Sequence, residues 1–254
     1  MIDIHCHILP GLDDGPASIA DSIDMARAAA NEGIDTIIAT PHYNHRYQND
    51  KRTILEKVHA LNQTLTERSI PVTILPGQEP RLFGDMLRAY ETEDLLTINN
   101  LHKYIFVELP HNEVPHYTKQ MLYNIQIEGL IPVIVHPERN KAILKNPDKL
   151  YDFVKNGALT QVTAASYIGR LGRNVKSFSK KIVESNLAHF IASDAHDTKK
   201  RPFHLRRAYE QLEKDFGRTA RYQFEENAYL LAEGRSIMKD VPEKVRQRSL
   251  LWFS

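Results

Sequence analysis

The sequence predicts a single-domain α/β fold, a closed or nearly closed parallel barrel built from seven strand–helix units. Three observations support this prediction. Short runs rich in isoleucine and valine, which are typical of buried parallel strands, recur along the chain. Segments with apolar residues at helical spacing lie between these runs. Most of the runs end in histidine, aspartate or glutamate, and α/β barrels place their chemistry at the carboxyl ends of the strands.

The expected elements follow one another in regular alternation. Gly33 and Gly129 mark the ends of two helices, and Pro71 limits a third, because glycine favours the left-handed conformation after a helix and proline disfavours helix before it. The strands are expected at 2–6, 34–40, 72–77, 104–109, 131–135, 159–163 (the weakest) and 189–193. The helices are expected at 16–32, 50–68, 81–90, 117–128, 147–156, 173–186, 203–216 and 224–233.

Composition limits the classes to which the protein can belong. The chain has 254 residues and is 42% hydrophobic, which suits one domain over 1–254 with a large core. Lys+Arg (33) and Asp+Glu (32) nearly balance, so no nucleic-acid partner is expected. A single cysteine excludes an intramolecular disulfide and fits a reducing, cytoplasmic setting. We expect neither a secretory signal nor a transmembrane segment.

The last ten residues are open to two interpretations. Residues 245–254 combine two arginines with the apolar run L-L-W-F. They could form a docking tail, but a terminal segment packed on the barrel is the favoured interpretation.

The strand ends carry residues that bind divalent metals. Because side chains alternate along a strand, His5 and His7 face one side, with Asp3, whereas Cys6 faces the other. Asp194 and His196 repeat this spacing. Imidazoles and carboxylates without a thiolate are typical of hydrolytic metal sites. The expected ligands are His5, His7, Asp14, His42, Glu79, Glu108, His136, Asp194 and His196.

The charges of this set favour several ions. Four carboxylates belong to it, and the histidines would bind as neutral rings. One divalent ion would leave the cluster negative, whereas three would leave it at about +2, which suits a phosphate dianion.

Several motifs together are similar to those of a known family. They are D-I-H-C-H-I-L-P-G-L-D-D-G at 3–15, I-A-T-P-H at 38–42, P-G-Q-E at 76–79, V-I-V-H-P-E-R-N at 133–140 and A-S-D-A-H at 192–196. The chain resembles the PHP (polymerase and histidinol phosphatase) family, and within it the bacterial protein-tyrosine phosphatases of the CpsB/YwqE type. The resemblance extends over nearly the whole chain.

The resemblance implies a distorted (β/α)7 barrel of PHP type with three metal ions, usually Mn2+, although Fe, Co, Mg or Zn are alternatives. It assigns the ligands to three groups. The first is His5, His7, Glu79 and Asp194; the second is Glu79, Glu108 and His136, with Glu79 bridging; the third is Asp14, His42 and His196.

The resemblance also implies hydrolysis of phosphotyrosine in proteins. Arg139 matches the family arginine that binds phosphate, and Arg206 is a second candidate, because a guanidinium can grip two oxygens. No general acid is assigned, although His42 or His196 could assist. The implied partner is a bacterial tyrosine kinase with a tyrosine-rich tail, which acts in capsule or exopolysaccharide regulation.

Three other functions compete with this interpretation. A cysteine phosphatase would need arginine six positions after Cys6, where the chain has Leu12, so that mechanism is rejected. Another PHP-type phosphoesterase, acting on histidinol phosphate or a nucleotide, could use the same ligands. A non-catalytic, metal-stabilised scaffold that binds a kinase is the third, although structural ions are normally enclosed by four ligands.

Overall fold

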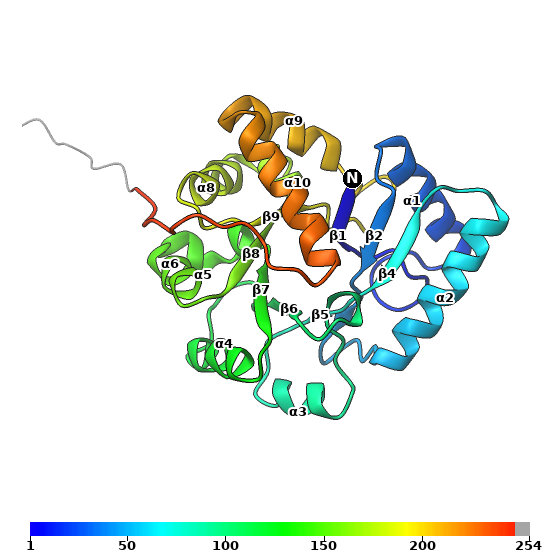
Figure 1. Ribbon diagram of the computed structural model, residues 1–254, viewed down its shortest axis with the longest axis horizontal. Helices are drawn as coiled ribbons and strands as arrows, with labels where there is room; N and C mark the ends of the chain where they lie inside the picture. The colour runs from blue at the N-terminus through cyan, green and yellow to red at the C-terminus, as the bar shows by residue number, and fades with distance from the viewer. Residues whose placement is uncertain (247–254) are drawn as a thin grey trace, which may run out of the picture.

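The computed structural model describes residues 1–246. Its strands lie at the centre of the molecule, and its helices surround them (Figure 1). The strands are β1 (Ile2–Cys6), β2 (Thr36–Ala39), β3 (His42–Tyr43), β4 (Thr73–Pro76), β5 (Glu79–Pro80), β6 (Tyr104–Glu108), β7 (Ile131–Val135), β8 (Leu159–Thr163) and β9 (Phe190–Ala192). The helices are α1 (Ile19–Asn31), α2 (Lys51–Glu67), α3 (Met86–Glu91), α4 (Thr118–Ile127), α5 (Lys141–Lys145), α6 (Asp148–Lys155), α7 (Ala164–Tyr167), α8 (Arg173–Glu184), α9 (Leu205–Phe216) and α10 (Arg218–Ala232). Two short 3-10 turns, η1 (Ile98–Asn100) and η2 (Pro137–Arg139), complete the set.

The strands pair in parallel, which confirms the predicted α/β fold. They form a four-stranded sheet (β6-β7-β8-β9), a three-stranded sheet (β1-β2-β4) and the pair β3-β5. Single parallel bridges, Cys6 to Ala195 and Arg81 to Glu108, connect these sheets. Within residues 1–246, the strands therefore fall into three sheets linked by bridges and do not form the one continuous ladder of a regular barrel.

The element bounds differ from the prediction where the chain passes the carboxyl ends of the strands. The seven expected strands are present, and β1, β7 and β8 have the expected bounds. The expected helix at 81–90 starts only at Met86, because the preceding residues continue as extended chain: Glu79 pairs with His42, and the Leu82 amide donates to the Glu108 carbonyl. The last helix begins at Arg218, earlier than expected, and α5 and α7 were not predicted.

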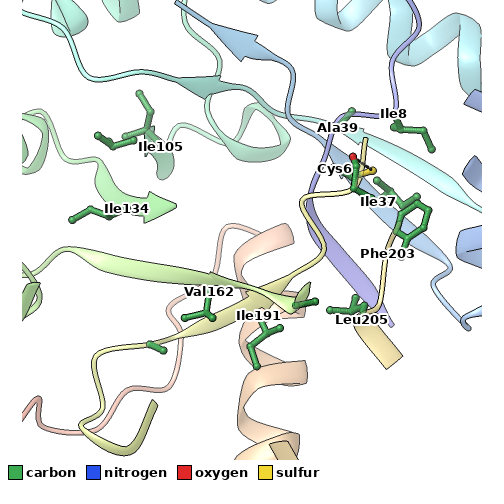
Figure 2. Packing of buried hydrophobic residues seen from close by; sticks show 14 of the residues in the cluster. Cys6, Ile8, Ile37, Ala39, Ile105, Ile134, Val162, Ile191, Phe203 and Leu205 are labelled. Atoms are coloured by element: carbon green, nitrogen blue, oxygen red, sulfur yellow. Dashed lines mark hydrogen bonds between the residues drawn. The ribbon is translucent and has the colours of Figure 1, made fainter. Parts of the chain in front are cut away.

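Two apolar clusters lie on opposite faces of the strands. Ile105, Ile134, Val162 and Ile191 point outward into a large cluster shared with the surrounding helices, and Cys6 lies in the same cluster (Figure 2). The alternate residues form a second cluster, which α10 closes through Ala228, Leu231 and Ala232. The strand residues of this inner cluster are Ile4, Ile38, Tyr104, Phe106, Val133, Val135, Leu159, Phe190 and Ala192.

This alternation leads directly to the polar strand ends. In β6 the inner face runs Tyr104, Phe106 and then Glu108, and after β9 it runs Phe190, Ala192 and then Asp194. Because side chains alternate along a strand, the inner face of each of these strands is apolar along its length and ends in a carboxylate.

The C-terminal segment is described only in part. Val245 is buried in the larger cluster, and the Glu243 amide donates to the Ser185 carbonyl at the end of α8. The rest of the predicted segment, 247–254, lies outside the described residues. Among the helices of residues 1–246, none is long and apolar enough to cross a membrane.

Candidate metal centre

The first strand, β1, and the segment after the last strand, β9, meet at the site. The Asp194 amide donates to the His5 carbonyl at 2.8 Å, and the His7 amide donates to the Ala195 carbonyl at 2.9 Å. These bonds hold the end of β1 against the segment that follows β9. The first two histidines are thereby brought beside Asp194 and His196.

The structure brings all nine expected ligands into four overlapping groups. Within each group the ligand atoms lie within 4.8 Å of one another. The groups are His7, Asp14, His42 and His196; His5, Glu79 and His136; His5, His7 and Asp194; and His42, Glu79 and Glu108. Glu79 is fully buried and has oxygens 2.7 Å from His136 Nε2 and 2.7 Å from His42 Nδ1, so it lies at the centre of the cluster.

Five buried atoms of this cluster form no well-aligned hydrogen bond with another described residue, although His42 Nδ1 and Glu79 Oε2 lie 2.7 Å apart. They are His5 Nε2, His7 Nε2, His42 Nδ1, Glu79 Oε2 and His196 Nε2. A buried polar atom without a partner costs about 1–3 kcal/mol. Their convergence on one space fits bound cations, which would satisfy all five.

Surrounding acceptors fix the orientation of three imidazoles. The Nδ1 atom of His5 lies 3.0 Å from Gln161 Oε1, that of His7 lies 2.6 Å from Asp13 Oδ2, and that of His196 lies 3.0 Å from the Asp194 carbonyl. A ring that donates from Nδ1 presents the Nε2 lone pair to the site, as metal-bound histidines do. Asp13 and Gln161 were not predicted, because their role depends on contacts between distant segments.

The turn at 11–15 separates the roles of two neighbouring aspartates. Asp13 accepts from the amides of Gly15 and His42 as well as from His7, so it is a supporting residue. Asp14 is half exposed and lies 3.3 Å from both His42 Nε2 and His196 Nε2. The turn requires Gly15, because a Cβ atom there would lie 2.3 Å from the His7 carbonyl oxygen.

The carboxylates strongly affect the pKa values of the histidines. Burial lowers the pKa of His42, but the charge of Glu79 and the close approach of the Asp14 and Glu79 carboxylates outweigh it and raise the pKa to about 9. Burial likewise opposes protonation of His7, yet Asp13 raises its pKa well above the usual value. Burial, followed by the charge of His7, lowers the pKa of His196 to about 4. Cations would displace the protons that these carboxylates otherwise hold on the rings.

Three arginines border the cluster, and two of them were not predicted. Arg139 Nη2 lies 2.8 Å from Asp194 Oδ2. Arg201 binds the same carboxylate at 3.1 Å and Asp14 at 3.3 Å. Arg81 forms a two-bond pair with Glu108, with both bonds at 3.0 Å. These cations balance part of the negative charge of the site.

The prediction for Arg206 is wrong. Its guanidinium donates to the backbone carbonyls of Asn31 and Glu32 at the C-terminal end of α1. That end of α1 lies at the start of β1, opposite the carboxyl ends of the strands, because the Met1 amino group donates to the Gly33 carbonyl at 2.9 Å. The side chain therefore anchors α9 to α1, and Arg201, not Arg206, lies beside Asp194 in the cluster.

Two of the expected ligands occupy a left-handed backbone conformation. His136 has φ 38° and ψ 48°, and Asp194 has φ 54°. This conformation costs a non-glycine residue about 1–2 kcal/mol. At both positions it turns the chain abruptly at the end of a strand, and both side chains join the cluster as a result.

A cavity of about 250 Å³ opens over the cluster. Arg81 and Arg201 stand at its border, with 36% and 39% of their side chains exposed. Its charged and imidazole lining consists of His42, Arg81, Glu108, His111, His136, Arg139, Asp194 and Arg201. An anionic group can therefore approach the cluster from solvent and meet guanidinium groups first.

Comparisons with known proteins agree with this geometry. The sequence model of the family described as "Capsular polysaccharide synthesis, CpsB/CapC" matches residues 1–231. The tyrosine-protein phosphatase YwqE of Bacillus subtilis is 47% identical over 254 residues, which is 100% of both chains. CapC of Staphylococcus aureus is 39% identical over 259 residues, covering 100% of this chain and 99% of its own.

The fold is also similar to a solved structure. That crystal structure belongs to a study of YwqE from Bacillus subtilis and CpsB from Streptococcus pneumoniae, described as "unique metal-dependent tyrosine phosphatases". The two structures match with a TM-score of 0.95 and 47% sequence identity. The match covers 97% of this chain and 100% of the solved chain.

Proposed function

Because this chain belongs to the CpsB/CapC family, we propose that it is a metal-dependent phosphatase that hydrolyses phosphotyrosine in proteins. The observation that carries the proposal is the group of five buried imidazole and carboxylate atoms that form no well-aligned hydrogen bond and converge beneath an arginine-lined cavity. The names of its full-length relatives give the substrate class.

The proposed ligands are the nine residues predicted from the sequence, with Glu79 shared between neighbouring groups. Three ions fit the overlap of four groups better than one, because no single point adjoins all nine side chains. Nitrogen and oxygen donors without a thiolate suit Mn2+, which we propose as the metal. When bound, divalent ions lower the pKa of water toward about 7 and neutralise phosphoryl oxygens.

The protein's own residues bind and orient the phosphate. Arg139 already directs its guanidinium to an oxygen of Asp194, and we assign it to two phosphoryl oxygens in the substrate complex. Arg201, which reaches Asp194 and Asp14, is assigned as the second phosphate-binding arginine. The phenol of tyrosine has a pKa of about 10 and needs less protonation than an alkoxide. No dedicated general acid is therefore assigned, and any assistance falls to His42 and His196.

The proposed substrate is a tyrosine-phosphorylated protein, in particular a bacterial tyrosine kinase with a flexible tyrosine-rich tail. A disordered tail can enter the cavity without any part of the kinase having to unfold. This assignment places the enzyme in the cytoplasm, in capsule or exopolysaccharide regulation.

A metal-dependent substrate panel tests the proposal. Protein treated with a chelator is reloaded with Mn2+, Fe2+, Co2+, Mg2+ or Zn2+ and assayed on a phosphotyrosine peptide, histidinol phosphate and a nucleotide. We expect reloading with Mn2+ to raise peptide turnover at least about 100-fold over that of the chelator-treated protein. This factor corresponds to about 3 kcal/mol of transition-state stabilisation. Preference for either small phosphoester would instead indicate a different PHP-type hydrolase. Folded, metal-loaded protein inert on all three would indicate a scaffold.

Cys6 should be dispensable for this reaction. Its thiol is fully buried on the outer face of β1, 3.5 Å from the Ala195 carbonyl, and burial raises its pKa well above the usual value (Figure 2). Cys6→Ser should keep activity and metal content within about twofold, while the buried hydroxyl lowers stability by about 1–2 kcal/mol in urea unfolding. Lost turnover in a folded, metal-loaded variant would contradict the metal-dependent mechanism.

A further inference from the structure

A second groove adjoins the metal-site cavity and carries an unusual charge. It has a volume of about 310 Å³ and shares Arg139, Asp194 and Arg201 with the first cavity. Beyond these shared residues, Arg170, Lys199 and Lys200 add three cationic side chains. Asp194 is the sole carboxylate among its described lining residues, so the groove is strongly basic. We call it the basic groove.

The charges in the basic groove are only partly compensated. Arg139 and Arg201 already bind Asp194, which is itself buried. Arg170, Lys199 and Lys200 are exposed and form no ion pair within the described part of the chain. The two lysines also border the aspartates of a neighbouring hollow, but none of the three cations forms an ion pair that supports a neighbouring element.

The groove also contains an unused polar atom. Thr163, at the end of β8, lines the basic groove, and its hydroxyl oxygen is buried with no hydrogen-bond partner among residues 1–246. The Thr163 amide, by contrast, donates to Glu138. The hydroxyl and the neighbouring Glu138 Oε2, which is also buried without a hydrogen-bond partner among these residues, make this end of the groove polar.

A neighbouring hollow, which shares Lys199 and Lys200 with the basic groove, has a different charge. The hollow that begins at Asp14 is lined by Asp21, Asp24 and Asp197 as well as by the two lysines. A peptide that leaves the metal centre through the basic groove would therefore meet mainly cations, whereas one that leaves past Asp14 would meet mainly carboxylates. Such asymmetry selects both the sequence and the direction of a bound chain.

From these observations we infer that the basic groove is a substrate subsite for anionic side chains that flank the phosphotyrosine on one side. This inference rests on the proposed function and adds the sequence preference of the substrate. A concave groove continuous with the metal-site cavity fits a peptide side chain better than a flat anionic membrane. The shared chemistry is a negative charge, supplied by glutamate, aspartate or a second phosphate.

The test compares matched phosphotyrosine peptides on the manganese-loaded, full-length protein. One flank at a time carries glutamate, serine, lysine or a second phosphotyrosine, and p-nitrophenyl phosphate reports the metal centre alone. We expect glutamate on one flank, and not on the other, to raise kcat/KM about tenfold over serine, chiefly through KM, and lysine to lower it. The gain should shrink with added salt, because the three cations are exposed. A comparable gain from the second phosphate supports the same subsite.

Variants separate the subsite from the catalytic centre. Arg170→Gln/Lys199→Gln/Lys200→Gln should remove the glutamate preference, and Arg170→Glu/Lys200→Glu should shift it toward lysine. Turnover of p-nitrophenyl phosphate should stay unchanged in both. Lys119→Glu, at an exposed lysine of α4 outside both cavities, is the matched control and should keep the preference.

Two results would overturn the inference while leaving the proposed function intact. One is equal kcat/KM of the unmodified protein for all the peptides, whatever residue flanks the phosphotyrosine. The other is binding to anionic vesicles that requires the three cations, without any peptide preference. Failure of the manganese-loaded protein on every phosphotyrosine peptide and on p-nitrophenyl phosphate would instead refute the proposed function itself.

Discussion

Glu79→Gln is expected to abolish activity, with kcat/KM reduced at least about 1,000-fold, and to lower the bound-metal content. Loss of a residue that supports a metal ligand typically lowers metal affinity or activity about 10- to 100-fold. Glu79 lies inside the ligand cluster itself, so the effect of its loss should be larger. It is fully buried and contacts His42 and His136 at 2.7 Å and His7 at 3.3 Å. The amide keeps the shape of the side chain but removes the charge that draws several imidazoles and cations together.

Elemental analysis of purified protein, combined with peptide turnover, measures this effect. Glu138→Gln is the matched control, because Glu138 is also fully buried but lies outside the four ligand groups and accepts from the Thr163 amide. It should retain its ions. A Glu79→Gln protein that holds the normal number of ions and remains active would refute the assignment of Glu79 as the shared ligand.

Arg139→Ala is expected to lower kcat/KM about 100- to 1,000-fold while the ions remain bound. Removing one preorganised donor to a developing negative charge typically has an effect of this size. Asp194 would keep Arg201 as a partner, so the ligand cluster should stay assembled. Arg139→Lys should recover only a small part of the loss, because an ammonium cannot form two parallel bonds to phosphate.

The control for this prediction is Arg206→Ala. Arg206 binds the backbone at the end of α1, so its removal should leave kcat/KM unchanged, although stability can fall. The decisive readout is metal content beside kinetics. If Arg139→Ala loses its ions, the arginine stabilises Asp194 and has no separate role in binding phosphate.

The strand ends could be predicted from the sequence because their signal is local. In a run such as Y-I-F-V-E, successive side chains point inward and outward in turn. Glu108 therefore lies on the inner face, because it is two positions after Phe106. The two-residue strands β3 and β5 could not be predicted, because two residues are too few to show a period.

The place of Arg201 in the site could not be predicted from the sequence, because it depends on a turn. Asp197 accepts from the amides of Lys199, Lys200 and Arg201, and the His196 amide donates to the Arg201 carbonyl. This turn brings Arg201 back beside Asp194. The sequence signal for this turn is an aspartate followed by a short polar run, since aspartate side chains commonly accept hydrogen bonds from the backbone amides of such turns.

The junction of β1 with the segment after β9 has a consequence for biosynthesis. His5 lies in β1, whereas its neighbour Asp194 follows β9, so all nine strands are synthesised before Asp194 is. Contacts so distant along the chain form late, because a long loop must first close. We therefore expect the ligand group of His5, His7 and Asp194 to assemble only after the β9 segment has been synthesised.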